Sequence, residues 1–215
     1  MNIQHSVNVP ALSGKRSMLR RLVTAATMGA LMLGVVSASA DGKKEGRGSY
    51  TVTTIAGMGD SYTGKLDVKG DGKFRVQDEG DKLVFISHLG AGKDLTMKDG
   101  RQEHTCGDKD GKGSKLGMDK DSKVKVTIEK SKITFPEAGK EASGSAPATV
   151  EFLKKTSNVT VKYSVKEDGG KYVIKSANFD FDYTKHTADG KKVCLAVVCV
   201  KPTVAIAITN GHVDK

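Results

Sequence analysis

The chain has 215 residues, with 35 Lys and Arg against 25 Asp and Glu, a formal net charge of +10, no Trp and 5% aromatic residues. The basic residues alternate with acidic ones and few aromatic side chains could stack on bases, so the composition argues against a nucleic-acid partner. The length suits one domain with its own hydrophobic core.

The first forty residues are organised like a secretory signal peptide. Ala38-Ser39-Ala40 matches the A-x-A cleavage pattern and follows an apolar run, Leu22 to Val36. This run is shorter than the roughly 20 residues that a membrane-spanning helix needs. Four basic residues precede it: Lys15, Arg16, Arg20 and Arg21. We therefore expect residues 1–40 to be a signal peptide, and residues 41–215 to be a single domain in the periplasm or secreted. An integral membrane protein is not expected.

The three cysteines are Cys106, Cys194 and Cys199. Export favours a disulfide, and an odd count leaves one thiol over. On a straight strand Cys194 and Cys199 would lie about 16 Å apart, so they can pair only if residues 195–198 turn back. The sequence slightly favours Cys194–Cys199. The other two pairings, and three free thiols, remain open.

After residue 41 the chain alternates apolar and polar residues between turn signals such as Asp-Gly and Gly-Gly. This period of two is typical of strands with one buried and one solvated face. Hairpin signals between the strands favour an antiparallel sandwich or barrel. The predicted strands are 48–56, 61–68, 73–78, 82–89, 122–134, 146–153, 158–167, 171–184 and 200–210. One short helical stretch is predicted within Lys93 to His104, and a small-residue connection within Gly139 to Pro147.

No motif for catalysis or metal binding stands out. Ser87 and His88 are neighbours on a predicted strand, where adjacent side chains face opposite ways. His104 and Cys106 could share a metal only with ligands from elsewhere, such as Cys194 and Cys199, and zinc sites usually pair their ligands more tightly. We expect a non-catalytic protein without a metal or other cofactor. The alternating apolar residues fit either a packed core or the lining of a cavity.

The order of the segments in 48–210 resembles the YceI-like family of periplasmic proteins. The resemblance rests on a strand that ends at Thr134-Phe135-Pro136, the pair Val150–Tyr163 and Tyr172–Tyr183, and a last strand at Val198–Val204. One departure is Lys98-Asp99-Gly100-Arg101, which lacks the histidine of the family's Arg-Asp-x-His step.

The resemblance implies an all-β fold, an eight-stranded antiparallel barrel similar to a lipocalin, with an isoprenoid or other long-chain amphiphilic lipid inside. Leu95 and Met97 would cover one end, and Asp99 and Arg101 would meet the polar head group. The inward residues implied as the apolar lining are Val124, Val126, Ile128, Val161, Tyr163, Phe179, Phe181, Val204 and Ile206.

Two functions follow from these patterns. The first is non-catalytic binding or carriage of such a lipid. The alternative is a structural or protein-interaction β-sandwich with a solid core. The sequence leaves a homodimer open in either case.

Overall fold

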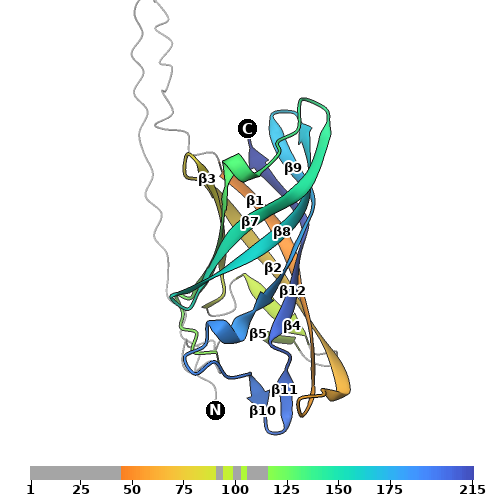
Figure 1. Cartoon of the computed structure of the whole chain (residues 1–215), viewed down its shortest axis with the longest axis vertical. Coiled ribbons are helices and arrows are strands. Elements are labelled where there is room, and N and C mark those ends of the chain that lie inside the picture. The colour runs from red at the N-terminus through yellow and green to blue at the C-terminus, as the bar shows by residue number, and fades with distance from the viewer. Residues whose placement is uncertain (1–44, 91–93, 99–102, 106–115) are drawn as a thin grey trace, which may run out of the picture. The chain divides into compact units, whose positions relative to one another are not determined.

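We describe residues 45–90, 94–98, 103–105 and 116–215 of a computed structural model (Figure 1). The predicted signal peptide lies outside these ranges and stays a prediction. The strands are β1 Glu45–Met58, β2 Thr63–Asp78, β3 Lys82–His88, β4 Leu95–Lys98, β5 Glu103–Thr105, β6 Lys123–Glu129, β7 Glu141–Phe152, β8 Lys155–Asp168, β9 Lys171–Asp182, β10 Cys194–Leu195, β11 Val198–Val200 and β12 Thr203–Asp214.

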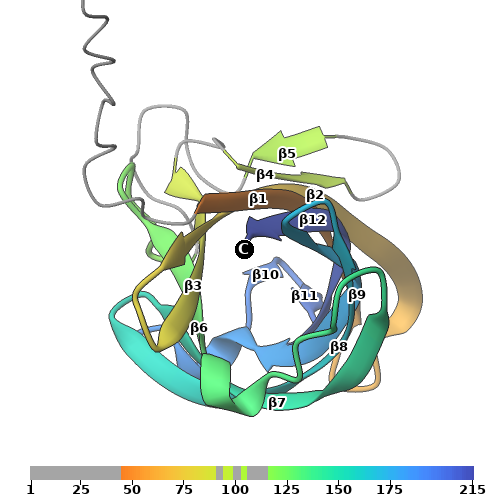
Figure 2. The ribbon, with the colours of Figure 1, turned by 90° about the horizontal axis from the view of Figure 1, so that it is seen from above.

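Eight of these strands close into an antiparallel barrel. The ring runs β1-β2-β3-β6-β7-β8-β9-β12, and β12 returns to pair with β1. Figure 2 looks along this ring, with the β4–β5 hairpin outside it. Each neighbour in the ring is also the next barrel strand in the chain, which makes it an up-and-down barrel without sheet edges. The predicted eight-stranded all-β barrel is confirmed, and a solid two-sheet sandwich is not the structure that forms.

The two ends of the barrel are distinguished by their turns. The upper end in Figure 1 holds the β8–β9 turn and the C-terminus, where the Lys215 amide donates to the Gly170 carbonyl over 2.9 Å. The lower end holds the β1–β2 turn and the β10–β11 hairpin, because Met58 pairs with Val198. At the upper turn Gly169 and Gly170 have φ values of +58° and +82°, which glycine adopts without steric cost.

The alternating apolar and polar residues of the barrel strands face the inside and the outside of the barrel, respectively. Along β7, for example, Ala146, Ala148, Val150 and Phe152 are buried, while the residues between them are exposed. Ala146, at 0% exposure, belongs to the closely packed part of this interior.

The structure corrects three local predictions. The helical stretch expected within Lys93 to His104 is wrong, because the described part of it forms β4 and β5. Pairing with β2 and across the hairpin satisfies the backbone there, and this tertiary contact outweighs a weak local preference. The described residues contain no α-helix, and the helical turns at Lys130–Lys132 and Tyr183–Lys185 are short 3-10 segments.

The expected break between 61–68 and 73–78 is also absent, since β2 runs through Asp71-Gly72 without turning. Gly72 faces the ring of Tyr50 instead, and a Cβ there would lie 2.2 Å from the ring. The connection expected within Gly139 to Pro147 is mostly the start of β7. There Gly144 packs beneath Tyr163, so the small residues make room for an aromatic side chain. In the described ranges, no helix has the length and apolar character of a membrane span.

Candidate functional site: an apolar cavity inside the barrel

A cavity of about 810 Å³ occupies the interior of the barrel. Side chains from all eight ring strands line it, together with others from β4, the β10–β11 hairpin and the connecting segments. The described lining includes no charged side chain, and most of it is Val, Ile, Leu and Phe. A concave site of this size and apolar character is typical of small-molecule binding sites.

The structure places most of the predicted lining residues at this cavity. Ten face it: Val124, Val126, Ile128, Val161, Tyr163, Phe179, Phe181, Val204, Ile206 and Leu95. Leu95 reaches it from strand β4 rather than from a helix. The side chain of Met97, and the whole of Asp99 and Arg101, lie outside the described residues, so their expected roles stay predictions.

Other lining residues were missed on several elements, including the first two strands. Tyr50, Val52 and Ala56 alternate along β1, and the same period-two pattern could have identified them. On β2 the cavity is lined by Leu66, Val68 and Phe74, but Gly70 and Gly72 interrupt their pattern. Leu89, Leu116 and Met118 come from irregular segments, where no periodicity marks a residue as inward.

The upper end of the cavity is covered by the segment that follows β6. Phe135 packs on Tyr172 with their ring centroids 4.8 Å apart, and both rings line the cavity. The Tyr163 hydroxyl accepts a hydrogen bond from the Thr134 amide over 2.7 Å, which ties this segment to strand β8. The aromatic contact and the hydrogen bond together hold an apolar cover over this end.

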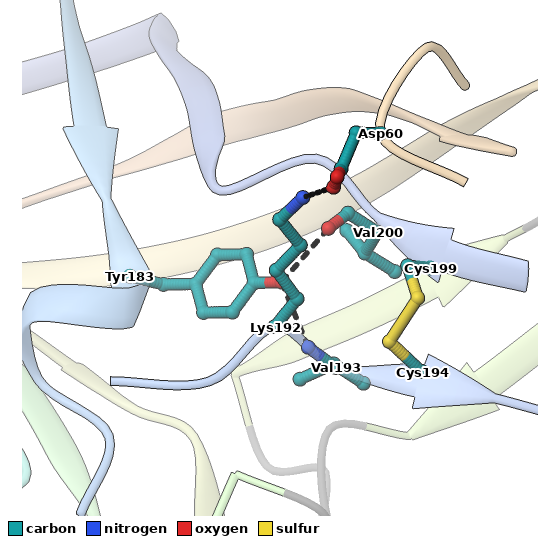
Figure 3. Close-up of a disulfide and its surroundings, with 7 residues drawn as sticks. All are labelled: Asp60, Tyr183, Lys192, Val193, Cys194, Cys199 and Val200. Carbon is teal, nitrogen blue, oxygen red and sulfur yellow. Dashed lines mark hydrogen bonds and ion pairs between the residues drawn. A yellow bond between two sulfur atoms is a disulfide. The ribbon is translucent and has the colours of Figure 1, made fainter. Parts of the chain in front are cut away.

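The lower end is bordered by the β10–β11 hairpin, which Figure 3 shows in close-up. Cys194 and Cys199 form a disulfide, the pairing that the sequence slightly favoured, and residues 195–198 turn back between them. The Tyr183 hydroxyl accepts from the Val193 amide and donates to the Val200 carbonyl, each over 3.0 Å. Burial raises the pKa of Tyr183, so this phenol keeps the proton that it donates.

Two long-range contacts attach the hairpin region to the β1–β2 turn. The Lys192 ammonium lies 2.7 Å from an Asp60 carboxylate oxygen and 5.2 Å from the centroid of the Tyr62 ring. The hydrogen bond from Lys192 lowers the pKa of Asp60 and raises that of Lys192. Because Asp60 is almost fully exposed, this pair contributes little to stability. The pair marks where the segment before β10 lies against the β1–β2 turn.

Polar chemistry inside the cavity is limited. The Tyr50 hydroxyl and Ser87 Oγ form a buried hydrogen bond of 2.8 Å. His88, the next residue along, is on the outer face, where its ring lies 3.8 Å from Asp94. Ser87 and His88 therefore point to opposite sides of the wall and cannot act as a nucleophile and its base.

His186 and the two disulfide-bonded cysteines have structural surroundings. His186, 1% exposed, has its Nδ1 2.9 Å from the Phe152 carbonyl and its Nε2 2.9 Å from Ser157 Oγ, so both ring nitrogens are engaged. The sulfurs of Cys194 and Cys199 are bonded to each other and are not available as thiolate ligands. Within the described ranges no group of three or more His, Cys, Asp or Glu side chains could hold a metal ion.

Comparison with known proteins gives a structural likeness but no match in sequence. No family model matches the chain, and no curated protein matches it. Among solved structures the chain is similar to that of a polyisoprenoid-binding domain from Saccharophagus degradans, implicated in plant cell wall breakdown. The two share 8% sequence identity with a TM-score of 0.49, and the match covers 80% of this chain and 99% of that one.

Proposed function

We propose that the protein binds a long-chain amphiphilic lipid of the isoprenoid type, or a similar apolar chain, inside the barrel, and that it does so without catalysis. The observation that carries the proposal is the cavity of about 810 Å³, whose described lining holds no charged side chain. Such a surface gains free energy by excluding water, at roughly 25 cal/mol for each Å² of apolar area that a ligand covers.

The shape of the lining supports a long ligand. The cavity reaches from Phe135 and Tyr172 at the upper end to Val193 and Val198 at the lower end. An extended hydrocarbon chain can contact apolar side chains over this whole length, whereas a compact polar substrate would leave its own polar groups unpaired.

The lower end is where a polar head group would meet water. Leu66 lines the cavity there and is 46% exposed. The proposal keeps the expectation that Asp99 and Arg101 contact the polar head group of the lipid.

Export fits the same function. The predicted signal peptide, 1–40, and the Cys194–Cys199 disulfide both support a periplasmic or secreted location, because disulfides persist in oxidising compartments. A carrier in such a compartment would shield an apolar chain from water between membranes.

A binding experiment with two matched variants on one strand tests the proposal. Val126 lines the cavity, while its neighbour Lys125 points outward and pairs with Glu151. Geranylgeraniol is added to the 41–215 protein, and the complex is followed by native mass spectrometry. The unmodified protein and Lys125→Trp should bind one ligand, and Val126→Trp should bind at least tenfold more weakly. Equal binding by both variants, or none by the unmodified protein, would refute the proposal.

A further inference from the structure

The lower end of the barrel exposes apolar side chains at the tips of two hairpins. Among the described residues the large hydrophobic side chains that stand out as exposed are Met58 at 47%, Leu66 at 46% and Val197 at 68%. Met58 and Leu66 flank the β1–β2 turn, and Val197 lies in the β10–β11 turn. We call these three residues the apolar rim.

Strand pairing brings the members of the rim together. Met58 pairs with Val198, the residue after Val197, and Ala56 pairs with Leu66 across β1 and β2. Scattered exposed apolar residues are normal on a protein surface, whereas a group gathered at one end of a barrel is typical of an interaction site.

The rim is continuous with the cavity. Leu66 belongs to both, and Val198, beside Val197 and Met58, also lines the cavity. An apolar surface therefore leads from the outside of the lower end to the interior, so a hydrocarbon chain could pass along it without crossing a polar surface.

The charged residues beside the rim are three lysines, Lys65, Lys192 and Lys201, and two carboxylates, Asp60 and Asp67, so the local balance is positive. Lys65 and Lys201 are both exposed, and neither forms an ion pair with another described residue. Asp60 lies close by, but Lys192 neutralises it. Apolar tips flanked by lysines are complementary to a bilayer that contains anionic phospholipids.

The rim is also held in place before any partner arrives. The disulfide fixes the β10–β11 hairpin, and the Tyr183 hydroxyl bonds to the backbone on both sides of it. A preorganised surface loses little conformational entropy on docking.

From these observations we infer that the apolar rim docks on the surface of an anionic phospholipid bilayer, and that the cavity exchanges its lipid there. The exchange rests on the proposed lipid binding, whereas the docking rests on the rim alone. With three apolar side chains in contact, docking is weak and reversible, as a protein that must leave the membrane again requires.

The absence of Trp from the chain allows a direct test. Val197→Trp places one indole in the rim, and Gln77→Trp places one on the exposed outer face near the upper end. Each variant is mixed with vesicles of phosphatidylglycerol and phosphatidylcholine, or of phosphatidylcholine alone. We expect a blue shift and quenching by brominated lipid for Val197→Trp with the anionic vesicles, and neither for Gln77→Trp. No blue shift of Val197→Trp, or equal shifts of both, would overturn the docking.

A second pair of measurements separates docking from lipid binding. Val197→Asp should lower partitioning onto anionic vesicles and the rate of geranylgeraniol transfer from them by about tenfold, since it removes an apolar side chain that would enter the bilayer and places a negative charge against anionic lipid. Its binding of geranylgeraniol in solution should equal that of the unmodified protein. An unchanged transfer rate would overturn the docking and leave the proposed function standing. If the unmodified protein did not bind geranylgeraniol in solution, the proposed function would be refuted and the docking would still stand.

Discussion

Enlarging one small residue of the cavity wall tests whether the interior is hollow, because the sign of the effect depends on it. Ala177 lines the cavity on β9, with Tyr163 and Ile208 as its cross-strand neighbours. Ala146 on β7 is 0% exposed and does not line the cavity. The two alanines therefore form a matched pair, one beside free space and one within packed atoms.

The expected magnitudes follow from the added carbon atoms. Ala177→Leu adds three, and at about 0.8 kcal/mol per buried CH₂ group they stabilise by about 2.4 kcal/mol. The lost rotamer freedom of Leu subtracts about 0.5–1 kcal/mol. The net gain in the free energy of unfolding is about 1.5 kcal/mol. Ala146→Leu should instead destabilise by about 1–3 kcal/mol, since a close-packed site must distort to admit the larger side chain.

Both variants can be followed by urea and thermal unfolding of the 41–215 protein without added lipid. In a domain of this size 1 kcal/mol corresponds to about 2–4 °C in Tm, so the two variants should move Tm in opposite directions by measurable amounts. If Ala177→Leu were destabilising to the same extent as Ala146→Leu, the interior would be a filled core and the reasoning about the cavity would be refuted.

Three further predictions concern the disulfide, a buried carboxylate and a cationic pair. Replacing Cys194 and Cys199 with Ser should lower the free energy of unfolding by about 2 kcal/mol, from the loop entropy of a sequence separation of five; equal urea midpoints would contradict this. The Gly139 amide, and more weakly the Gly170 amide, donate hydrogen bonds to the Glu167 carboxylate and lower its pKa below the ordinary 4.5. The ionised carboxylate therefore stabilises the fold above pH 4.5, and this stabilisation is lost as the pH falls through the lowered pKa. The Tm deficit of Glu167→Gln should thus be present at neutral pH and vanish in acid; a deficit that persists in acid would point to packing. Arg47 and Arg75 are cross-strand partners on the outer face, so Arg75→Glu should raise stability by about 0.5 kcal/mol in low salt, and a decrease would show that an anion normally neutralises them.

The sequence was most informative where one face of a strand is apolar and the other polar. Val124, Val126 and Ile128 repeat every second residue, and the structure places all three on the cavity wall. A barrel wall imposes this period on every strand, so the fold class and much of the lining could be inferred from local pattern alone.

Prediction failed where a residue's role depends on a distant partner. The Asp71-Gly72 pair has the composition of a turn, but Gly72 is needed because the Tyr50 ring packs against it from another strand. Leu95 lies in a strand because β2 offers its backbone a partner. Neither contact can be predicted from the residues next to it in the sequence.

The same limit applies to the ends of the cavity. Phe135 and Val193 border the two ends from irregular segments, whose positions are set by single contacts such as the Tyr163 and Tyr183 hydrogen bonds. Whether the interior is filled or hollow likewise depends on the side-chain volumes contributed by all the strands together, so no single segment can predict it.

Native mass spectrometry of the protein purified without detergent from its own kind of cell, followed by organic extraction of whatever is bound, tests the central claim most directly. The cavity and its apolar lining predict one long-chain lipid per protein, released on extraction, with a mass that identifies the chain. A protein that carries nothing, and whose mass stays unchanged after incubation with isoprenoid lipids, would contradict the account.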